Sequence, residues 1–410
     1  MEYSKIGDIC LKVCSGGTPT SSNPNYYNGG IPWLNTNEVN FCNIYSTNKT
    51  ISQEGLDHSA AKYIPANTVI VAMYGVTAGK SAIAKIPLTT NQACCNLVID
   101  ATKADYRYVY YFLKQQSDNL NKLANGGAQQ NLNSLIIKKY KIALPDLEVQ
   151  QRIASILSTY DALIENNTKR IRLLEKMAEN LYKEWFVRFR FRGHENVEME
   201  NGLPKGWKVE KLGEWGIELE TGKRPKGGID GSIKDGCPSL GAECIKELAS
   251  FDYSSVKMVP KDFYDSLKRG KSSGNDILLY KDGAYIGKVT MFRDSFPYSE
   301  YSINEHVFFL SPMNIKYRNY LYFTLHQKEF FALMQNLNRN AAQPGLSRSD
   351  VERVKIVVPP SKIVEFFDLQ VERMLKVIFS LAKQNSLLAR QRDLLLPRLM
   401  SGKLEVKVKA

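Results

Sequence analysis

The feature that most constrains how this chain can fold is an internal repeat. Short landmarks in the first half recur in the same order, and at nearly the same spacing, in the second half. Such self-similarity is the signature of one structural module used twice. The paired landmarks are residues 15–19 (SGGTP) with 221–225 (TGKRP), 32–34 (PWL) with 238–240 (PSL), 75–80 (GVTAGK) with 283–288 (GAYIGK), and 141–145 (KIALP) with 355–359 (KIVVP).

Each copy opens with a globular part, in which short apolar runs are punctuated by Gly, Asn and Pro. That pattern is typical of strands and turns. Two stretches have the spacing of amphipathic helices, residues 106–123 and 317–337, so we predict a mixed α/β (α+β) fold for the globular parts. The predicted domains are residues 1–145 and 203–359, with long helices at residues 146–192 and 360–402.

Each copy then continues into a segment whose apolar residues recur at steps of three and four over about five heptads, which is the pattern of a coiled coil. The simplest way to bury both stripes is an antiparallel coiled coil of the two helices, which would relate the two domains by a pseudo-twofold axis. Asn167 and Asn385 could face each other and fix the register, or each could point to the edge of its stripe. The predicted seam consists of Ile153, Ile156, Tyr160, Leu163, Asn167, Leu174, Met374, Ile378, Leu381, Asn385 and Leu388.

Composition favours a polyanionic partner. The 55 Lys and Arg residues outnumber the 42 Asp and Glu residues and give a formal net charge of +13. Nucleic acid is the first candidate for such a partner, although basic proteins that are indifferent to DNA are common. Seven cysteines without a C-x-x-C pair, no signal peptide and no long apolar run predict a soluble, cytoplasmic protein with reduced thiols. The four histidines are scattered, so no metal site is predicted.

The glycine pair of the third landmark is similar to a phosphate loop but does not fit one. Three residues separate Gly75 from Gly79, where a nucleotide-binding loop needs four, and no hydroxyl residue follows Lys288 in the second copy. The favoured interpretation is a turn that brings Lys80 or Lys288 close to a DNA phosphate. A purely structural turn between strands is the alternative. Residues 358–361 (VPPS) lack the polar and aromatic residues of an amino-methyltransferase motif, and no catalytic residue is predicted.

Polar and aromatic residues beside the landmarks are candidates for reading DNA bases. Asn and Gln side chains suit adenine, whereas Arg and Lys side chains suit guanine. For any one of them, a solvated surface position is an equally good interpretation. The candidates are Asn35, Thr36, Asn37, Tyr74, Thr77, Gln129 and Gln130 in the first copy, and Lys223, Arg224, Tyr280, Lys281, Arg339, Gln343 and Arg348 in the second.

In its ordered set of motifs the chain resembles the specificity subunit of type I restriction-modification enzymes, over nearly its whole length. The second copy departs from the family pattern, because Ala341 stands where glycine is usual and the Glu-Gln pair is absent after Pro359. Residue roles therefore transfer less directly into that copy. The motifs are residues 15–19 (SGGTP), 127–132 (GAQQNL), 145–153 (PDLEVQQRI), 181–189 (LYKEWFVRF), 203–207 (LPKGW) and 396–404 (LPRLMSGKL).

The resemblance implies two target recognition domains, each reading one half of an asymmetric bipartite DNA site, with the long helices as spacer. It also implies modification subunits that dock on the helices and methylate adenine with S-adenosylmethionine. Restriction subunits with motor and nuclease activity would join them, and ATP and Mg²⁺ are expected there, whereas this chain would be non-catalytic and hold no cofactor. Apolar residues outside the seam could pack partner subunits, which we favour, or the recognition domains: Leu157, Ile164, Leu173, Met177, Leu375, Phe379, Leu387 and Leu394.

Two other interpretations are open at this point. The chain could be the detached specificity portion of a single-chain methyltransferase-nuclease, but the missing methyltransferase motif argues against it. It could also be a basic coiled-coil scaffold that reads no sequence. Such a scaffold would bind every duplex equally well, and salt would abolish that binding.

Overall fold

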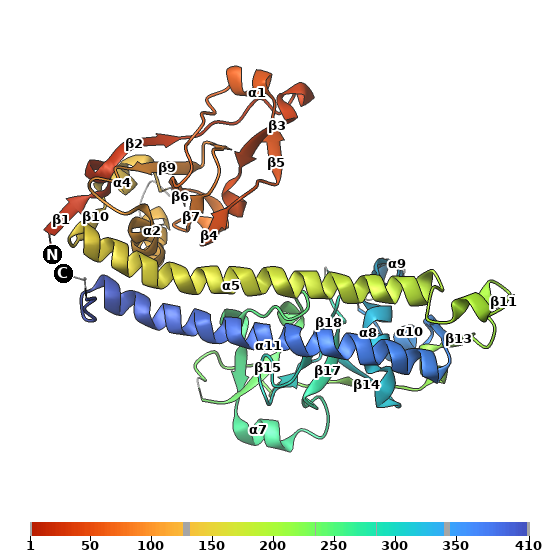
Figure 1. Cartoon of the computed structure of the whole chain (residues 1–410). Coiled ribbons are helices and arrows are strands. Elements are labelled where there is room, and N and C mark those ends of the chain that lie inside the picture. Colours follow the sequence, from red (N-terminus) through yellow and green to blue (C-terminus); the bar gives the residue numbers. More distant parts are fainter. Residues whose placement is uncertain (1, 126–131, 234, 284, 340–344, 408–410) are drawn as a thin grey trace. The chain divides into compact units, whose positions relative to one another are not determined.

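The computed structural model describes residues 2–125, 132–233, 235–283, 285–339 and 345–407 (Figure 1). The chain divides into two compact units, residues 1–163 with 388–410, and residues 164–387. The division runs through both long helices, α5 (Leu147–Tyr182) and α11 (Ser361–Met400). Each unit is therefore a globular part together with a segment of each long helix. The domain ranges predicted from the sequence treat each long helix as a separate, undivided segment. Those ranges stay predictions.

The first unit contains a five-stranded sheet in the order β2-β9-β6-β7-β4, a three-stranded sheet in the order β5-β3-β8, and the pair β1-β10. Its central strand β6 is a run of Val, Ile, Val and Ala, all buried, which suits a strand covered on both faces. The strands are β1 (Glu2–Lys5), β2 (Cys10–Ser15), β3 (Tyr27–Leu34), β4 (Cys42–Ile44), β5 (Lys49–Ile51), β6 (Val69–Ala72), β7 (Ser81–Ala84), β8 (Thr89–Thr90), β9 (Cys94–Ile99) and β10 (Lys141–Leu144).

Helices α1 (Gln53–Asp57), α2 (Tyr106–Gln115), α3 (Ser117–Asn125) and α4 (Ser134–Lys139) complete the globular part of this unit. Asp105 caps α2, because its carboxylate accepts hydrogen bonds from the backbone N–H groups of Arg107 and Tyr108. The buried face of α2 shares one hydrophobic core with Leu157 of α5 and Leu399 of α11. The ends of both long helices are therefore part of the core of the first unit.

The second unit contains a four-stranded sheet in the order β14-β20-β17-β18, a three-stranded sheet in the order β16-β15-β19, and the pairs β13-β21 and β11-β12. Its strands are β11 (Met199–Glu200), β12 (Leu203–Pro204), β13 (Lys208–Lys211), β14 (Ile217–Thr221), β15 (Cys237–Leu240), β16 (Lys257–Val259), β17 (Asn275–Tyr280), β18 (Val289–Arg293), β19 (Ser302–Ile303), β20 (Val307–Pro312) and β21 (Lys355–Val358). Its shorter helices are α6 (Leu212–Trp215), α7 (Lys261–Ser266), α8 (Arg318–Leu325), α9 (Lys328–Arg339) and α10 (Arg348–Glu352).

The sheets of the second unit repeat those of the first. The order β14-β20-β17-β18 corresponds to β2-β9-β6-β7, and β16-β15-β19 corresponds to β5-β3-β8. In each three-stranded sheet the middle strand has one antiparallel and one parallel neighbour. Trp33 lies opposite Thr89 on the parallel side of the first sheet, and Ser239 lies opposite Ser302 on that of the second. The landmarks at residues 32–34 and 238–240 therefore occupy equivalent places in two mixed helix-and-sheet modules.

Within the second unit, α5 and α11 run in opposite directions, because residues later in α5 contact residues earlier in α11. The Nδ2 atom of Asn167 donates to Oδ1 of Asn385 at 3.0 Å. Tyr182, the last residue of α5, packs against Phe367 near the start of α11, with ring centroids 6.2 Å apart. The Asn167 side chain is buried, and its amide is satisfied by groups on the facing helix. In the first unit, Asp161 of α5 forms an ion pair with Arg392 of α11.

Burial corrects part of the assignment of apolar residues along the helices. Leu163, assigned to the seam, is 46% exposed, because a repeat of threes and fours leaves the edges of a stripe undefined. Leu157, Leu375 and Phe379, for which partner docking was favoured, are fully buried in the cores of their own units. Each helix packs on a globular part as well as on the other helix, so its buried stripe is wider than one seam.

The described residues contain no helix with the length and hydrophobicity needed to cross a lipid bilayer. None of the seven cysteines, all of which lie among the described residues, forms a disulfide. Burial raises the pKa of Cys95 to about 12, so this thiol stays protonated and inert at neutral pH.

Candidate nucleic-acid interface

In the first unit, two short turns bring most of the predicted DNA-contacting residues together. The first is a 3-10 helix, η3 (Thr36–Glu38), which directly follows strand β3 and is capped by Asn35 in a capping box. The second is η4 (Gly75–Thr77), which follows β6. The hydroxyl of Thr77 donates to the backbone carbonyl of Thr36 at 2.8 Å, so the two turns are joined.

Lys80 closes the second turn and reaches across to the first. Its Nζ atom donates to Oδ1 of Asn40 at 2.9 Å and lies 5.9 Å from the ring centroid of Phe41. Asn40 is an exposed, neutral partner rather than a carboxylate. The ammonium group therefore keeps its positive charge available for an anion, as a phosphate contact requires.

The second glycine of the landmark has a structural reason of its own. Gly79 has a positive φ of 82°, and a Cβ atom there would lie 2.7 Å from the backbone oxygen of Ser117 in α3. Gly287 has a φ of 88°, and its Cβ would lie 2.4 Å from Cβ of Met334 in α9. In both units a helix packs directly on the turn, so these glycines are explained by close packing and backbone conformation. The role of the adjacent lysines is a separate question.

In the second unit the equivalent turn, between β17 and β18, has the same backbone arrangement, but its lysine is paired with a carboxylate. The backbone N–H of Tyr280 donates to the carbonyl of Lys288 at 2.8 Å, which closes the hairpin. The Lys288 ammonium lies 3.1 Å from Oε1 of Glu247, whose side chain is 73% exposed. An ion pair this exposed contributes little stability, so a phosphate can replace the carboxylate at small cost.

A second group of predicted residues converges on Glu305. The Nε atom of Arg224 lies 3.1 Å from Oε1 of Glu305, and Nζ of Lys281 donates to the backbone carbonyl of Glu305 at 3.4 Å. Burial, followed by the charge of Glu243, raises the pKa of Tyr280, so its phenol stays neutral and can donate a hydrogen bond. The structure thus gathers Arg224, Tyr280, Lys281 and Lys288 around one hairpin.

The remaining predicted residues are buried, exposed or paired elsewhere, or have side chains that are not described. The side chain of Thr77 is buried and bonded to the backbone, so it holds the turns together and offers no group to a base. Asn37, Tyr74 and Lys223 are exposed, while Arg348 is exposed and paired with Glu352 at 2.6 Å. Arg339 is the last residue of α9, and its side chain is not described. Gln129, Gln130 and Gln343 lie outside the described residues.

Sequence reasoning missed the residues that the predicted basic groups contact. Asn40, Glu247 and Glu305 are each far from their partners in the chain, and no spacing rule connects them. It also missed the two exposed side chains at the hairpin tips, Val76 at 96% and Tyr285 at 62% exposure. The sequence could have indicated both residues, because each lies between the two glycines of the repeated landmark.

Comparison with known proteins identifies the class to which this fold and these turns belong. The family model of the type I restriction modification DNA specificity domain matches the chain twice, at residues 1–176 and 204–394. The chain therefore belongs to the family of type I restriction-modification specificity proteins, as the resemblance in its motifs predicted.

Particular relatives agree with this. The chain is 30% identical to the type I restriction enzyme MjaIX specificity subunit of Methanocaldococcus jannaschii, over 99% of this chain and 94% of that protein. It is 29% identical to the EcoR124I/EcoR124II specificity subunit of Escherichia coli, over 44% of this chain and 46% of that protein. The crystal structure of the S subunit of a type I restriction-modification system from M. genitalium has the same fold. Its TM-score is 0.58 at 19% identity, with 100% of this chain and 96% of that chain covered.

Proposed function

We propose that this chain is the DNA-specificity subunit of a type I restriction-modification complex, and that its two target recognition domains each read one half of an asymmetric bipartite site. The observation that carries the proposal is the repeated sheet order, in which equivalent turns bear different side chains. Lys80 faces a neutral amide, whereas Lys288 and Arg224 pair with carboxylates. Two modules of one fold with different surfaces suit two half-sites of different sequence.

The long helices act as the spacer between the two readers. We propose that they form an antiparallel coiled coil, and that a pseudo-twofold axis relates the modules, as suits a protein addressing two half-sites on a duplex. The opposed contacts Asn167 to Asn385 and Asp161 to Arg392 support this arrangement. A hydrogen-bonded polar pair in an apolar seam fixes register, because any shift would leave the buried amide of Asn167 unsatisfied.

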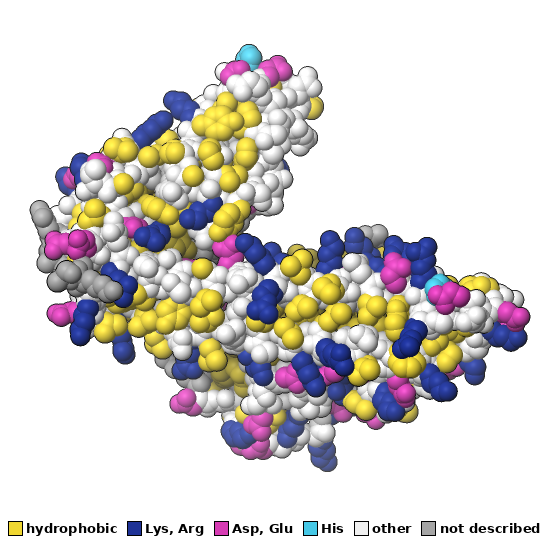
Figure 2. All heavy atoms as spheres, viewed as in Figure 1, with side chains coloured by type: hydrophobic (Ala, Val, Ile, Leu, Met, Phe, Trp, Pro, Cys, Tyr) yellow, Lys and Arg dark blue, Asp and Glu magenta, His cyan; other side chains and the backbone are white. Residues whose placement is uncertain are grey.

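Partner subunits carry the chemistry in this proposal. Modification subunits dock on the helices and methylate adenine with S-adenosylmethionine, and restriction subunits with bound ATP and Mg²⁺ cleave DNA in the cytoplasm. The support is an exposed apolar set that the chain itself leaves uncovered: Leu173 at 64%, Met177 at 54%, Leu387 at 60% and Leu394 at 57% exposure. Figure 2 shows hydrophobic side chains along these helices, interspersed with Lys and Arg. Such a mixture suits helix-on-helix association with a protein partner.

The experiment that tests the proposal is methylation mapping of DNA from cells that co-express this chain with its modification subunit. We expect adenine methylation at one asymmetric two-part motif, absent when the modification subunit is expressed alone. Methylation without a motif would favour the scaffold interpretation. Methylation by this chain alone, supplied with S-adenosylmethionine, would favour the single-chain enzyme. Either result would overturn the assignment as a non-catalytic specificity subunit.

Lys80→Ala is expected to weaken binding of the complex to every duplex while preserving its preference for the target. One lost phosphate contact should also reduce the slope of log affinity against log salt by about 1. Fluorescence anisotropy with target and scrambled duplexes at several salt concentrations measures both quantities. Lys103→Ala is the matched control, because its amine is held by the backbone oxygen of Asp8 at 3.0 Å. A changed preference in Lys80→Ala would refute the phosphate assignment.

Replacing Leu173 and Met177 together by glutamate is expected to abolish copurification of the modification subunit. The two residues lie one turn apart on α5, and two charges there would be desolvated on docking. The exposed Lys176→Glu on the same turn is the control for added negative charge. Circular dichroism should show an intact fold in all variants. Retention of the partner by the double variant would place the docking surface elsewhere.

A further inference from the structure

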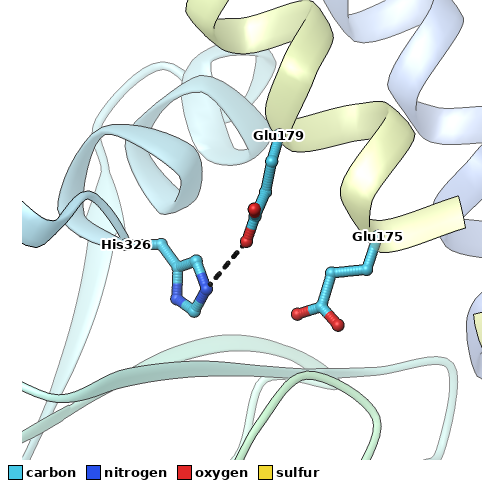
Figure 3. Close-up of side chains that lie close together, drawn as sticks. All are labelled: Glu175, Glu179 and His326. Carbon is cyan, nitrogen blue, oxygen red and sulfur yellow. Dashed lines mark ion pairs between the residues drawn. The ribbon is translucent and has the colours of Figure 1, made fainter. Parts of the chain in front are cut away.

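Three side chains with metal-binding atoms converge where α5 meets the globular part of the second unit. Glu175 and Glu179 lie one turn apart on α5, and His326 directly follows α8. One ligand atom from each residue lies within 4.8 Å of the others, and Nε2 of His326 is 3.3 Å from Oε1 of Glu179. Figure 3 shows the Glu175 carboxylate turned towards the same space as the Glu179–His326 ion pair.

The burial pattern of α5 shows that this orientation is built into the helix. Ile171 and Ala178 are buried in the core, whereas Leu173 and Met177 are exposed. Glu175 and Glu179 occupy a third face, where the Glu179 side chain is 27% and that of His326 is 26% exposed. The cluster is therefore partly enclosed rather than a group of acids on an open surface.

A buried hydroxyl beside the cluster has no partner. The side chain of Tyr322 is fully buried, and its phenol oxygen has no hydrogen-bond partner among the residues that the structure describes. Its ring stacks on the His326 imidazole with centroids 5.2 Å apart. An unpaired buried donor is costly, and it is satisfied when a ligand of the neighbouring site accepts from it.

Glu175 is also incompletely compensated. It makes no hydrogen bond or ion pair within the described part of the chain, and its side chain is only partly exposed. A cation beside both carboxylates would balance the negative charge of Glu175, for which the described residues supply no partner.

We propose that Glu175, Glu179 and His326 bind a divalent transition-metal ion such as Zn²⁺ or Mn²⁺. Imidazole and carboxylate ligands together suit these ions, whereas Ca²⁺ and Mg²⁺ are held by oxygen ligands. Metal–ligand bonds of about 2.0–2.2 Å place two ligand atoms at most about 4.4 Å apart, so small side-chain rotations complete the site. The three residues leave a position for water, and the unpaired hydroxyl of Tyr322, whose ring stacks on His326, is available as a donor to the site.

The consequence is a cross-link between an element of the spacer and a recognition domain. The ion joins α5 to the end of α8, and so fixes the rotation of α5 about its own axis. That rotation sets the direction in which Leu173 and Met177 face. The site is structural and takes part in no chemical step of methylation or cleavage.

Co²⁺ titration of the full-length chain tests the proposal, because its visible spectrum reports the ligand type. We expect one tightly bound ion with nitrogen and oxygen ligands, seen as d–d bands without the sulfur-to-metal charge-transfer band of a cysteine site. Glu175→Gln and His326→Gln should each weaken this binding by more than the roughly 10- to 100-fold cost of losing an outer-shell partner. Isothermal titration calorimetry gives the affinity and stoichiometry.

His306→Gln is the matched control. The two nitrogens of His306 face Asp282 at 2.9 Å and Glu305 at 3.6 Å, so these acids lie on opposite sides of the ring and cannot share one ion with it. This variant should bind Co²⁺ as the wild type does. Glu175→Gln keeps the Glu179–His326 ion pair, so its fold should survive even if that of His326→Gln does not. Absence of a stoichiometric ion, a thiolate spectrum, or unchanged binding by Glu175→Gln would overturn the proposal.

Discussion

Replacing Phe367 by alanine is expected to lower the free energy of unfolding of the second unit by about 3–5 kcal/mol. Phe367 lies on α11 and is fully buried. Its ring centroid is 4.9 Å from that of Phe186, 6.0 Å from that of Phe323 and 6.2 Å from that of Tyr182. The cavity would open where α5, α11 and α8 meet, and the rings packed edge-on around it cannot collapse to fill it.

The neighbouring residue provides the control. Phe366 has the same side chain on the same helix but is 49% exposed, and the Arg192 guanidinium lies 5.8 Å from its ring centroid. Phe366→Ala should cost about 1 kcal/mol or less, since it removes an exposed cation–π contact and little buried area. Urea denaturation followed by circular dichroism measures both values. Equal costs for the two variants would mean that the aromatic cluster does not form as described.

Glu372→Ala is the second variant with a large expected effect, a loss of about 3–5 kcal/mol. The Glu372 carboxylate accepts two hydrogen bonds from Arg293, at 2.8 and 2.6 Å, and a third from Asn319 at 3.2 Å. The Arg293 side chain is only 9% exposed. Removing the carboxylate leaves the buried guanidinium with only the partly exposed Asp294, at 3.0 Å from its Nε atom. Its two terminal nitrogens then lose their charged partner, and that desolvated charge is the main cost.

Glu365 lies seven residues earlier on the same helix and is the matched control. Its ion pair with Lys316 has a similar distance, 3.0 Å, but the two side chains are 46% and 63% exposed. Glu365→Ala should change stability by less than about 1 kcal/mol, because solvent already screens an exposed pair. A comparable loss in both variants would show that burial does not govern the strength of these pairs.

The Glu372 pair also predicts a dependence on pH. Burial alone would raise the pKa of Glu372, but the hydrogen bonds and charge of Arg293 outweigh it and hold that pKa below its usual value of 4.5. A carboxyl with a lowered pKa in the folded state stabilises the protein above its unfolded pKa, and this stability is lost as the pH falls through the folded pKa. The difference between wild type and Glu372→Ala should therefore be largest near neutral pH and shrink below about pH 4.5.

The sequence could indicate the repeat and the class of fold, because landmarks at strand ends keep their order in both copies. Residues 32–34 and 238–240 do take equivalent places beside β8 and β19. It could not give the order of strands within a sheet. Strand β2 pairs with β9, far along the chain, and that choice depends on how whole faces pack rather than on local propensity.

The candidate interface was predictable only in part, for the same reason. Repeat landmarks place Lys80 and Lys288 at equivalent turns, but no pattern foretells that one bonds to Asn40 and the other to Glu247. Thr77 was chosen for its hydroxyl, which instead joins two turns of the backbone. Helical periodicity likewise shows that Leu157 and Leu375 belong to apolar faces, but not that their own domains cover them.

The second compact unit is inserted in sequence between the two segments of the first, and this has a consequence for the evolution of such a chain by recombination. The second unit, residues 164–387, is one uninterrupted stretch of sequence enclosed by the two parts of the first. A gene segment bounded near these codons would carry a complete globular module with its own portions of both helices. Asn167 and Asn385 would travel together, so the recipient would receive a matched polar pair. Recombination could therefore exchange one reader in a single step without separating residues that fold against each other.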